Sequence, residues 1–420
     1  MSALPSLRPA GSAQQRDWTH VDPLGVRVHA RTWCSGPRDN PVPVVLLHGL
    51  GLSSRYLVPL GRRLAVLGHD VVAPDLPGFG RSPRDPHLRW PGGPDVARQT
   101  EHLLAWLDAK GIARASFFGN SVGSQVAVEL AARHPERVHR LVLCGPTPDP
   151  AYRTPLKQYP RVLRNMVFEA PSTIPVFQVE YLSTGVARMI QQLVRTVDDP
   201  IETRLPQVQA PVLVVRGRYD QTLSQPWAQQ FTGLLPDGRL VVIDGAAHNA
   251  HYSTPEVTAA LADLFLRGAL DSRPADADQP LDVLPADDDG PLARRRLSPR
   301  DHAVLDYLTA ALLVTVPRAL GWGPRTRRLL ALFGVWGLAD SALTDYPGGA
   351  VRKIPLPVHL NLEASAGLQL LLASVTLLRG EPAAGRLAVA AQGLYELLRS
   401  SLTRIPAGPV RLVSVLPTTD

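Results

Sequence analysis

Residues 117–123, Phe-Phe-Gly-Asn-Ser-Val-Gly, decide how the rest of the chain is interpreted. An apolar run ends here, as expected of a short buried strand, and a helical period follows directly. The pattern between them is G-x-S-x-G, which places Ser121 at a sharp strand-to-helix turn with its hydroxyl clear of the backbone. Gly119 and Gly123 keep side chains out of that turn. Ser121 is therefore a candidate nucleophile, and its partners must be found elsewhere in the chain.

Apolar runs and helical patterns alternate on both sides of this turn. Strands are predicted at residues 26–33, 43–47, 70–73, 138–144, 211–215 and 240–243, and helices at 56–67, 95–110 and 255–267. Such alternation predicts an α/β fold, a mostly parallel sheet with helices on both faces. Ligands bind at the carboxyl ends of the strands in sheets of this kind.

Chemically capable residues follow directly after several of these strands. Ser121, Asp220 and His248 occur in the chain order Ser-Asp-His. A serine hydroxyl needs a base to take its proton, and the base needs a carboxylate to orient it. The charge that develops on an attacked carbonyl needs preplaced donors. The candidates are the backbone N–H groups of Leu50 and Val122.

Five motifs together carry a resemblance to the α/β-hydrolase superfamily, in its cap-bearing serine-hydrolase branch of esterases and lipases. They are His48-Gly49-Leu50-Gly51, Asp75 to Ser82, Gly119 to Gly123, Gly217 to Asp220, and Gly245 to His251 with Pro255-Glu256. The resemblance covers residues 15–270 and implies a helical cap at about 146–207. It further implies that Ser121 is the nucleophile, His248 the general base and Asp220 the orienting acid, with no metal or organic cofactor.

Other residues near these motifs have competing interpretations. Asp149 is the rival orienting carboxylate, and His251 is the rival base. His48, with Gly49 and Gly51, is expected to shape the turn that holds Leu50, and Asn120 is expected to be a structural turn residue. Five cap side chains are candidate substrate contacts or core residues: Met166, Phe168, Phe177, Tyr181 and Met189.

The expected substrate is a small-molecule carboxylic ester or related acyl compound. Dehalogenase-like and epoxide-hydrolase-like relatives carry Asp at the position of Ser121, which argues against both. Carbon–carbon-bond hydrolases of this fold share an Asn before the serine, as in Asn120, but typically carry Trp where Asn249 stands. That activity, and a catalytically idle fold used as a binding module, remain the alternatives.

The composition limits the other classes of function. The chain has 420 residues, 45% of them hydrophobic, and a net charge of +7 that comes mostly from scattered arginines. Basic residues are not gathered on one face with aromatics between them, so no nucleic-acid partner is predicted. Residues 1–14 are expected to be a loose tail without a signal peptide. Cys34 and Cys144 are expected to be free thiols.

The sequence changes character after the α/β part. Residues 271–299 are expected to be a linker, and 300–420 a domain of four apolar helices. This domain resembles small bacterial four-span membrane proteins, and Arg294 to Arg296 with Arg300 would keep its start on the cytoplasmic face. The expectation is therefore an enzyme at the cytoplasmic face of a membrane, and the alternative is a soluble four-helix bundle in the cytoplasm. The pattern predicts no oligomeric state.

Overall fold

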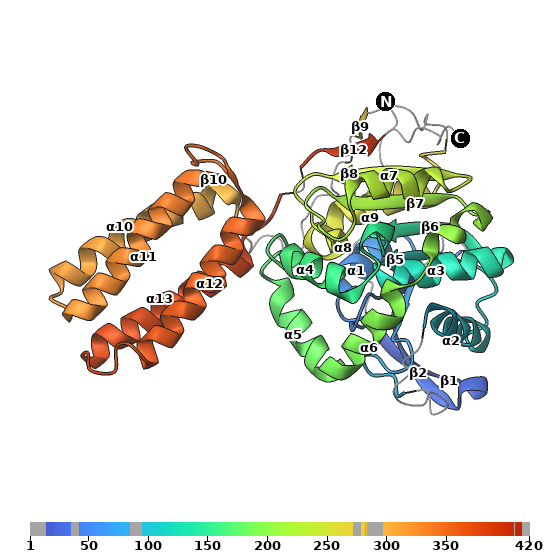
Figure 1. Cartoon of the computed structure of the whole chain (residues 1–420), viewed down its shortest axis with the longest axis horizontal. Coiled ribbons are helices and arrows are strands. Elements are labelled where there is room, and N and C mark those ends of the chain that lie inside the picture. The colour runs from blue at the N-terminus through green and yellow to red at the C-terminus, as the bar shows by residue number, and fades with distance from the viewer. Residues whose placement is uncertain are drawn as a thin grey trace. The chain divides into compact units, whose positions relative to one another are not determined.

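The structure is a computed structural model that describes residues 14–34, 42–84, 95–271, 279–281, 283, 297–406 and 408–413. The chain divides into two compact units. The sheet unit comprises Met1–Met166, Pro175–Ala286 and Ala407–Asp420, and the helical unit comprises Val167–Ile174 and Asp287–Pro406. Figure 1 shows strands and helices in the first unit and long helices in the second.

A ten-stranded sheet forms the centre of the sheet unit, in the order β1-β2-β4-β3-β5-β6-β7-β8-β12-β9. Neighbours from β4 to β8 pair parallel, and every pair outside that group is antiparallel. The strands are β1 (Gln15–Val21), β2 (Val26–Trp33), β3 (Val44–Leu47), β4 (Val71–Pro74), β5 (Ala115–Asn120), β6 (Val138–Cys144), β7 (Val212–Gly217), β8 (Gly238–Ile243), β9 (Gln279–Leu281) and β12 (Val410–Val413). This sheet confirms the predicted α/β-hydrolase fold.

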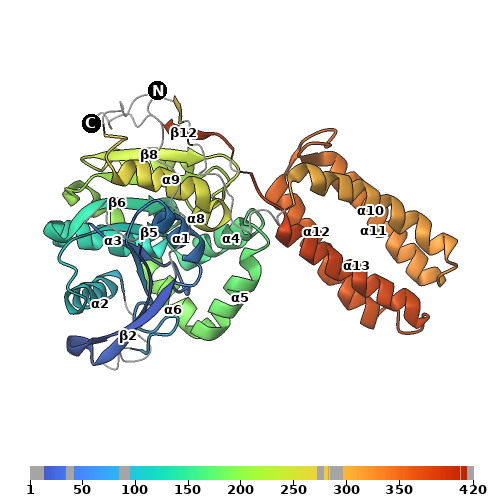
Figure 2. The ribbon, with the colours of Figure 1, turned by 180° about the vertical axis from the view of Figure 1, so that it is seen from behind.

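Helices cover both faces of the sheet (Figures 1 and 2). They are α1 (Val58–Val66), α2 (Val96–Ala109), α3 (Val122–Arg133), α7 (Gln225–Gly233), α8 (Ala250–Ser253) and α9 (Pro255–Leu266). Phe117 belongs to the core cluster beneath α2, α3 and α7, and its neighbour Phe118 to the cluster beneath α1, α8 and α9. Successive side chains of a strand point to opposite faces, so a strand covered on both sides must be apolar throughout.

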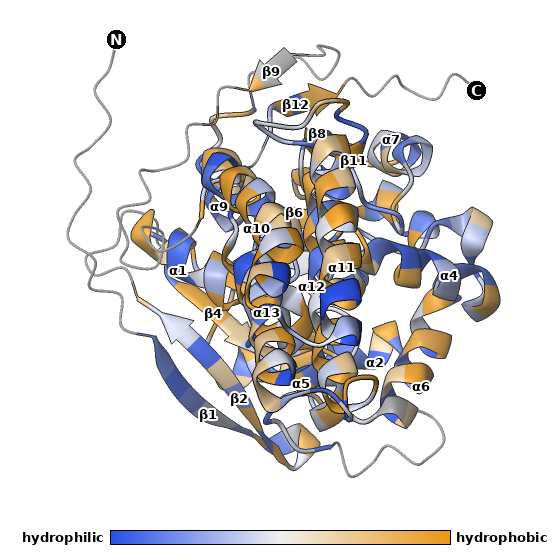
Figure 3. Ribbon diagram, turned by 90° about the vertical axis from the view of Figure 1, so that its left-hand side faces the viewer, coloured by the Kyte–Doolittle hydropathy of each residue, from blue (hydrophilic) through white to orange (hydrophobic). Residues whose placement is uncertain are grey.

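The edge strand β1 was not predicted. Its side chains are mostly polar and largely exposed, so it lacks the apolar run that marks the central strands. Figure 3 shows β1 mostly in blue, the colour of hydrophilic residues. Pairing with β2 along its whole length defines it as a strand, and that pairing is a tertiary contact.

Three helices lie between β6 and β7, within the segment predicted to form the cap. They are α4 (Pro155–Met166), α5 (Thr173–Thr184) and α6 (Val186–Val197). Two cap side chains contact the backbone of Gly51: the N–H of Gly51 donates to Oε1 of Gln192 (2.8 Å), and Oγ1 of Thr184 donates to its carbonyl (2.9 Å). Residues of the cap are thus fixed against the turn that was predicted to hold Leu50.

The helical unit consists of two helical hairpins (Figure 1). The first contains α10 (Pro299–Ala319) and α11 (Pro324–Leu343), and the second α12 (Leu356–Val375) and α13 (Ala383–Leu402); β10 (Thr344–Asp345) pairs with β11 (Ile354–Pro355) between them. The hairpins are alike inside. A Cβ on Gly334 would lie 2.8 Å from the carbonyl oxygen of Ala310, and one on Gly393 would lie 2.6 Å from that of Gly367. In each hairpin a glycine therefore brings the two helices into close contact.

The membrane-spanning prediction for these helices is not supported. Among the helices of the described residues, none is both long enough and apolar enough to cross a bilayer. The physical reason is that ionisable side chains interrupt the apolar runs, at Asp306, Asp340, Glu363, Glu396 and Arg399. The resemblance to four-span membrane proteins and the placement at a membrane face lose their basis. The run Arg294 to Arg296, on which the orientation depended, lies outside the described residues.

The chain returns to the sheet unit after its last long helix. The four-helix domain was predicted to extend from 300 to 420, whereas the compact helical unit ends at Pro406 and β12 pairs antiparallel with β8. The apolar residues of β12 cover the edge of a sheet that would otherwise end at β8. Most of the predicted linker 271–299 and residues 1–13 of the predicted tail lie outside the described residues.

Candidate active site

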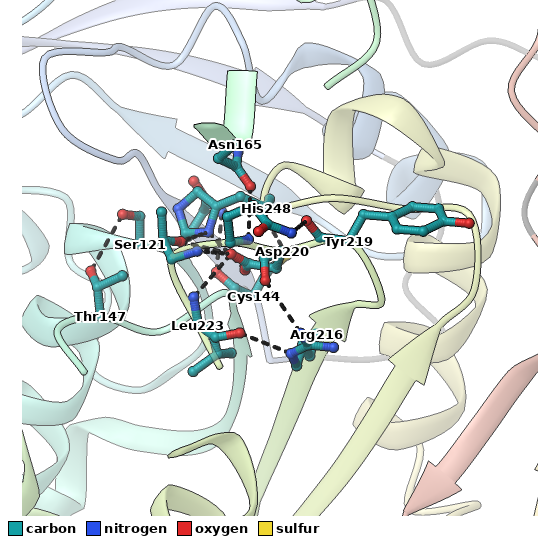
Figure 4. Close-up of polar contacts among 12 residues, drawn as sticks. Ser121, Cys144, Thr147, Asn165, Arg216, Tyr219, Asp220, Leu223 and His248 are labelled. Carbon is teal, nitrogen blue, oxygen red and sulfur yellow. Dashed lines mark hydrogen bonds and ion pairs between the residues drawn. The ribbon is translucent and has the colours of Figure 1, made fainter. Parts of the chain in front are cut away.

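Ser121 lies at the turn between β5 and α3. Its backbone has φ 53° and ψ −118°, a conformation that non-glycine residues rarely adopt and that requires support from the surrounding structure. The support is close packing: a Cβ on Gly119 would lie 2.6 Å from the carbonyl oxygen of Gly123, and one on Gly123 would lie 2.4 Å from that of Leu47. Only glycine fits at either position. The Ser121 hydroxyl is half-buried and lies 3.4 Å from Oγ1 of Thr147 (Figure 4).

Asp220 and His248 form a hydrogen-bonded pair. Asp220 follows β7 and His248 follows β8, and Nδ1 of the imidazole lies 2.9 Å from Oδ2 of the carboxylate (Figure 4). Nδ1 also lies 2.7 Å from Oγ1 of Thr222, whose hydroxyl donates to Oδ1 of Asp220 (2.7 Å). Both neighbours of Nδ1 are therefore acceptors, so Nδ1 carries the proton. The neutral imidazole is left with an unprotonated Nε2.

Several donors hold Asp220 in its ionised form. Burial alone would raise its pKa, but the charge of His248 and the hydrogen bond from it, together with bonds from Leu223 and Thr222, lower that pKa below its usual value. Oδ1 accepts from the N–H groups of Thr222 (2.7 Å) and Leu223 (3.0 Å). The carboxylate side chain is fully buried, whereas 11% of the His248 side chain is exposed. A fixed negative charge thus lies behind an imidazole that solvent reaches.

Two contacts tie the His248 loop to the Ser121 turn. Nδ2 of Asn120 donates to the carbonyl oxygens of His248 (3.3 Å) and Cys144 (3.1 Å). The N–H of Ser121 donates to the same Cys144 carbonyl (3.1 Å). A Cβ on Gly145, the next residue, would lie 2.6 Å from Nδ1 of His248, so the ring packs directly on this backbone. The side chain predicted to be a structural turn residue thus connects the two loops.

Tyr56 extends this connection to the turn at residues 48–51, and sequence reasoning did not identify it. The N–H of Gly49 donates to the Tyr56 hydroxyl (2.8 Å), which donates to Oδ1 of Asn120 (2.7 Å). Burial raises the pKa of the Tyr56 hydroxyl well above its usual value, so the hydroxyl keeps its proton. No signal in the sequence marks this tyrosine, because its partners lie in two other segments.

His48 holds the same turn from the other side. Its Nε2 accepts from the N–H of Leu76 (3.2 Å), so the proton is on Nδ1, which lies 3.1 Å from the carbonyl oxygen of Gly49. Burial lowers the pKa of this imidazole. His48 is thus a neutral side chain that joins residues 48–51 to the loop 75–82.

The two N–H groups predicted to stabilise an oxyanion lie in fixed backbone. Val122 is the first residue of α3, where an N–H has no acceptor within the helix. Leu50 lies between two residues whose N–H groups are held, since Gly49 donates to Tyr56 and Gly51 donates to Gln192. The positive end of α3 also favours negative charge beside Val122.

The rival residues occupy other places. Asp149 accepts from the N–H of Ala151 (3.0 Å) and the hydroxyl of Ser224 (2.8 Å), so it caps the short helix Pro150–Tyr152 and binds Ser224 instead of orienting His248. His251 is fully buried, and its ring packs edge-on against Tyr56. Burial, with the nearby charge of His248, lowers the pKa of His251 to about 3. Its position suits core packing.

Arg216 and Asn165 also support the acid loop, and the sequence-based prediction missed both. The Arg216 guanidinium is buried and donates to the carbonyl oxygens of Leu223 (2.9 Å) and Asp220 (3.2 Å). Asn165 of the cap helix α4 accepts from the N–H of Gln221 (3.2 Å). Figure 4 shows Arg216 beside Leu223 and Asp220. An arginine inside an otherwise apolar strand was the available sequence signal for this residue.

Three of the five candidate cap side chains lie near Tyr56 or Gly51, one is exposed, and one belongs to the helical unit. Phe177 is buried against Tyr56, with ring centroids 6.5 Å apart, and Tyr181 packs on Phe177. Tyr181 and Met189 also lie close over Gly51. Met166 is 41% exposed. Phe168 groups with the helical unit.

Comparisons with known proteins agree with this fold. Residues 42–174 match the family model described as the alpha/beta hydrolase fold, and residues 187–277 match one described as TAP-like protein. Esterase YbfF of Escherichia coli is 24% identical over 257 residues, which cover 55% of this chain and 95% of the esterase. A provisionally named carbamate hydrolase, RutD of Pseudomonas savastanoi, is 27% identical over 241 residues, 52% of this chain and 90% of RutD.

A third relative matches a shorter segment more closely. The 2-hydroxymuconate semialdehyde hydrolase of Pseudomonas putida is 41% identical over 104 residues, which are 24% of this chain and 36% of that enzyme. The relatives are hydrolases that act on different bonds. The protein is an enzyme with the α/β-hydrolase fold, followed in the chain by a helical unit.

Proposed function

We propose that the protein is a serine hydrolase that cleaves a carboxylic ester or a related acyl bond of a small molecule through an acyl-enzyme at Ser121. One observation carries the proposal. Asp220 and Thr222 both accept from Nδ1 of His248, which leaves Nε2 of that ring unprotonated at the carboxyl ends of the strands, where β5 ends just before Ser121. A base in this tautomer is what a serine nucleophile requires.

In the first half of the reaction, Oγ of Ser121 attacks the acyl carbon while Nε2 of His248 accepts the hydroxyl proton. The imidazolium that forms is stabilised by the buried carboxylate of Asp220, which lies 2.9 Å from Nδ1. The oxygen of the attacked carbonyl becomes negative and accepts from the N–H groups of Leu50 and Val122. His248 then gives its proton to the leaving alcohol, and the acyl group remains on Ser121.

In the second half, a water molecule takes the place of the alcohol. Nε2 of His248 accepts a proton from the water as its oxygen attacks the acyl carbon. The bond to Oγ of Ser121 breaks, the proton returns to Oγ, and the carboxylic acid leaves. Each half uses the same base and the same donors.

The test is active-site labelling of the purified full chain with a fluorophosphonate probe, read by intact mass, alongside turnover of short p-nitrophenyl esters. We expect one adduct on Ser121 and none in Ser121→Ala. Ser116→Ala is a matched control, because Ser116 lies on the same strand near its other end, where its hydroxyl lies 3.1 Å from Nδ1 of His139. A chain that takes no label and turns over no ester would instead be a hydrolase fold used as a binding module.

Carbon–carbon-bond hydrolysis is the second candidate. It is favoured by the 41% identity to a 2-hydroxymuconate semialdehyde hydrolase over 104 residues and by Asn120 before the serine. In this chain the amide of Asn120 bonds to Tyr56 and to the carbonyl oxygens of Cys144 and His248, so it has a positioning role under either reaction. A vinylogous 1,5-diketone assayed beside the ester panel distinguishes the two, because only a carbon–carbon hydrolase cleaves it.

A further inference from the structure

The helical unit encloses four buried side chains that are all able to bind a metal ion. His302 and Asp306 lie one turn apart on α10, and His359 and Glu363 lie one turn apart on α12. One donor atom from each residue can be chosen so that all four lie within 4.8 Å of one another. Each pair comes from a different hairpin, so the group exists only where the hairpins meet.

The distances around this group have the size of a coordination sphere. The Nε2 atoms of His302 and His359 lie 3.3 Å apart. With Oδ2 of Asp306 and Oε2 of Glu363 as the carboxylate donors, Nε2 of His302 lies 3.0 Å from Oε2 of Glu363, and Nε2 of His359 lies 3.2 Å from Oδ2 of Asp306. Four ligands at about 2.0–2.1 Å from a tetrahedral centre would be separated by roughly 3.3–3.4 Å.

The second nitrogen of each imidazole is held from the opposite hairpin. Nδ1 of His302 lies 2.6 Å from Oγ1 of Thr403, which follows α13. Nδ1 of His359 lies 2.8 Å from Oδ2 of Asp340 and 3.0 Å from Oγ1 of Thr344, both from the first hairpin. Metal-binding histidines are commonly fixed in this way, with Nδ1–H donated to a carboxylate or another acceptor and Nε2 left for the ion. Both rings can then direct a lone pair to the same point.

The balance of buried charge also favours a cation. The carboxylates of Asp306, Asp340, Glu363 and Glu396 are all buried in this region, and the guanidinium of Arg399 contacts three of them, Asp306, Glu363 and Glu396. With neutral imidazoles, the negative charges outnumber the positive one. Uncompensated buried charge is costly, and a divalent ion would reduce the excess.

Arg399 does not block the group. It contacts Oδ1 of Asp306 (2.8 Å) and Oε1 of Glu363, which leaves Oε2 of Glu363 for an ion. Oδ2 of Asp306 accepts from the Tyr346 hydroxyl (2.6 Å) and has a second lone pair for an ion. A cavity in this unit is lined by Asp306, Asp340, Glu363, Glu396 and Arg399 together with apolar side chains of α10, α11 and α12. The two carboxylate ligands thus border a cavity that is lined by both charged and apolar side chains.

We infer that His302, Asp306, His359 and Glu363 form a binding site for one divalent first-row transition metal ion that joins the two hairpins of the helical unit. Two imidazoles with two carboxylates suit Zn²⁺ and its neighbours and not Ca²⁺, which takes oxygen ligands at longer distances. The site is independent of the hydrolytic proposal, since it shares no residue with the Ser121 turn.

The test uses the full chain, stripped with a chelator and exchanged into metal-free buffer. Titration with Zn²⁺ is expected to saturate at one ion per chain and to raise the melting temperature. Co²⁺ is expected to give the intense visible absorption of a four-coordinate site, and Ca²⁺ to give no binding. His302→Gln and Glu363→Gln are expected to abolish the high-affinity site, while His139→Gln, a histidine of the sheet unit, retains it.

Thr403→Val keeps the assay decisive if a ligand variant fails to fold. This substitution leaves all four ligands in place and removes the oxygen that accepts from Nδ1 of His302 and donates to the carbonyl of Arg399, so zinc affinity should fall by about 10–100-fold. Stripped wild-type chain that binds no Zn²⁺ at micromolar concentration would overturn the inference and identify the group as a closed network of ion pairs. Equal zinc affinity in wild type, His302→Gln and Thr403→Val would overturn it as well, by placing the ion elsewhere.

Discussion

At the candidate active site of the sheet unit, one imidazole faces one carboxylate; in the helical unit, two imidazoles lie among four carboxylates and one guanidinium. His248 has its Nδ1 on Asp220 and an Nε2 that is left for a proton, and its side chain is 11% exposed. His302 and His359 turn their Nε2 atoms toward each other at 3.3 Å, and both are buried. Histidine and carboxylate side chains thus suit proton transfer at the candidate active site and the binding of a cation in the helical unit.

The pKa values of ionisable groups in the two regions also show this difference. At Asp220, burial is outweighed by His248 and the surrounding donors, and the pKa of the carboxyl is lowered. At His359, burial would lower the pKa of the imidazole, but bonds to Asp306, Asp340 and Glu363 outweigh it and raise that pKa to about 11. One histidine thus faces enough negative charge to be oriented, and the other faces enough to bind a cation, whether a proton or a metal ion.

The largest expected effect is a loss of catalytic rate at the candidate active site. His248→Gln should lower kcat for ester hydrolysis by about a millionfold, because the base and the nucleophile of such a site act as one unit. Steady-state kinetics measures it, with His134→Gln, a partly exposed histidine outside the site, as the control. If His248→Gln kept the wild-type kcat, His248 would not be the base, and its arrangement would not differ in role from that of His302 and His359.

The orienting carboxylate should have the next largest effect. Asp220→Asn keeps the shape of the side chain but offers Nδ1 of His248 a donor, so the ring loses its tautomer and kcat should fall by about 10⁴. Asp149→Asn is the matched comparison, because this carboxylate accepts from Ala151 and Ser224 instead. An equal loss in both variants would mean that Asp220 does not orient the base.

The third prediction concerns the unfolding free energy of the helical unit. Arg399→Met removes the guanidinium that contacts Asp306, Glu363 and Glu396, so the metal-free chain should lose about 3–5 kcal/mol of unfolding free energy in the helical unit. Added Zn²⁺ should recover part of that loss. Denaturant unfolding with and without zinc tests this, and Arg379→Met, an exposed arginine after α12, should change stability by less than about 0.5 kcal/mol.

The smallest effect concerns the link between turns of the sheet unit. Tyr56→Phe removes one hydroxyl that accepts from Gly49 and donates to Asn120, which should cost about 1 kcal/mol. Ester kcat should fall several-fold, because the turn that carries Leu50 loses its anchor, while KM changes little. Unchanged kcat together with lowered stability would limit Tyr56 to a structural role.

The sheet was predictable where each strand is buried on both faces. The strand at Val138–Cys144 was predicted with its observed bounds, and the strands that precede His48 and Ser121 were predicted within one or two residues. The short loops after these strands carry His48, Ser121, Asp220 and His248, so their meeting at one edge follows from the parallel order. Strands β1 and β12 were missed, because their residues become strands only by pairing with neighbours.

The helical unit shows where such reasoning ends. The carboxylates of Asp306, Asp340, Glu363 and Glu396 interrupt the apolar segments on which the membrane interpretation was based. A histidine and a carboxylate four residues apart are common on helices, so neither His302 with Asp306 nor His359 with Glu363 predicts a metal site from sequence. The four residues form a candidate site only because the two hairpins bring them together.

By itself the sequence determined the α/β fold, the nucleophile turn and the order of its candidate partners, because these depend on local periodicity and on glycines within a few residues of Ser121. Tertiary structure alone decided that Tyr56, Asn120 and Arg216 support the site, that β12 returns to the sheet, and that two histidine–carboxylate pairs converge. Contacts between distant segments depend on how packed surfaces fit together, and no local pattern records that fit.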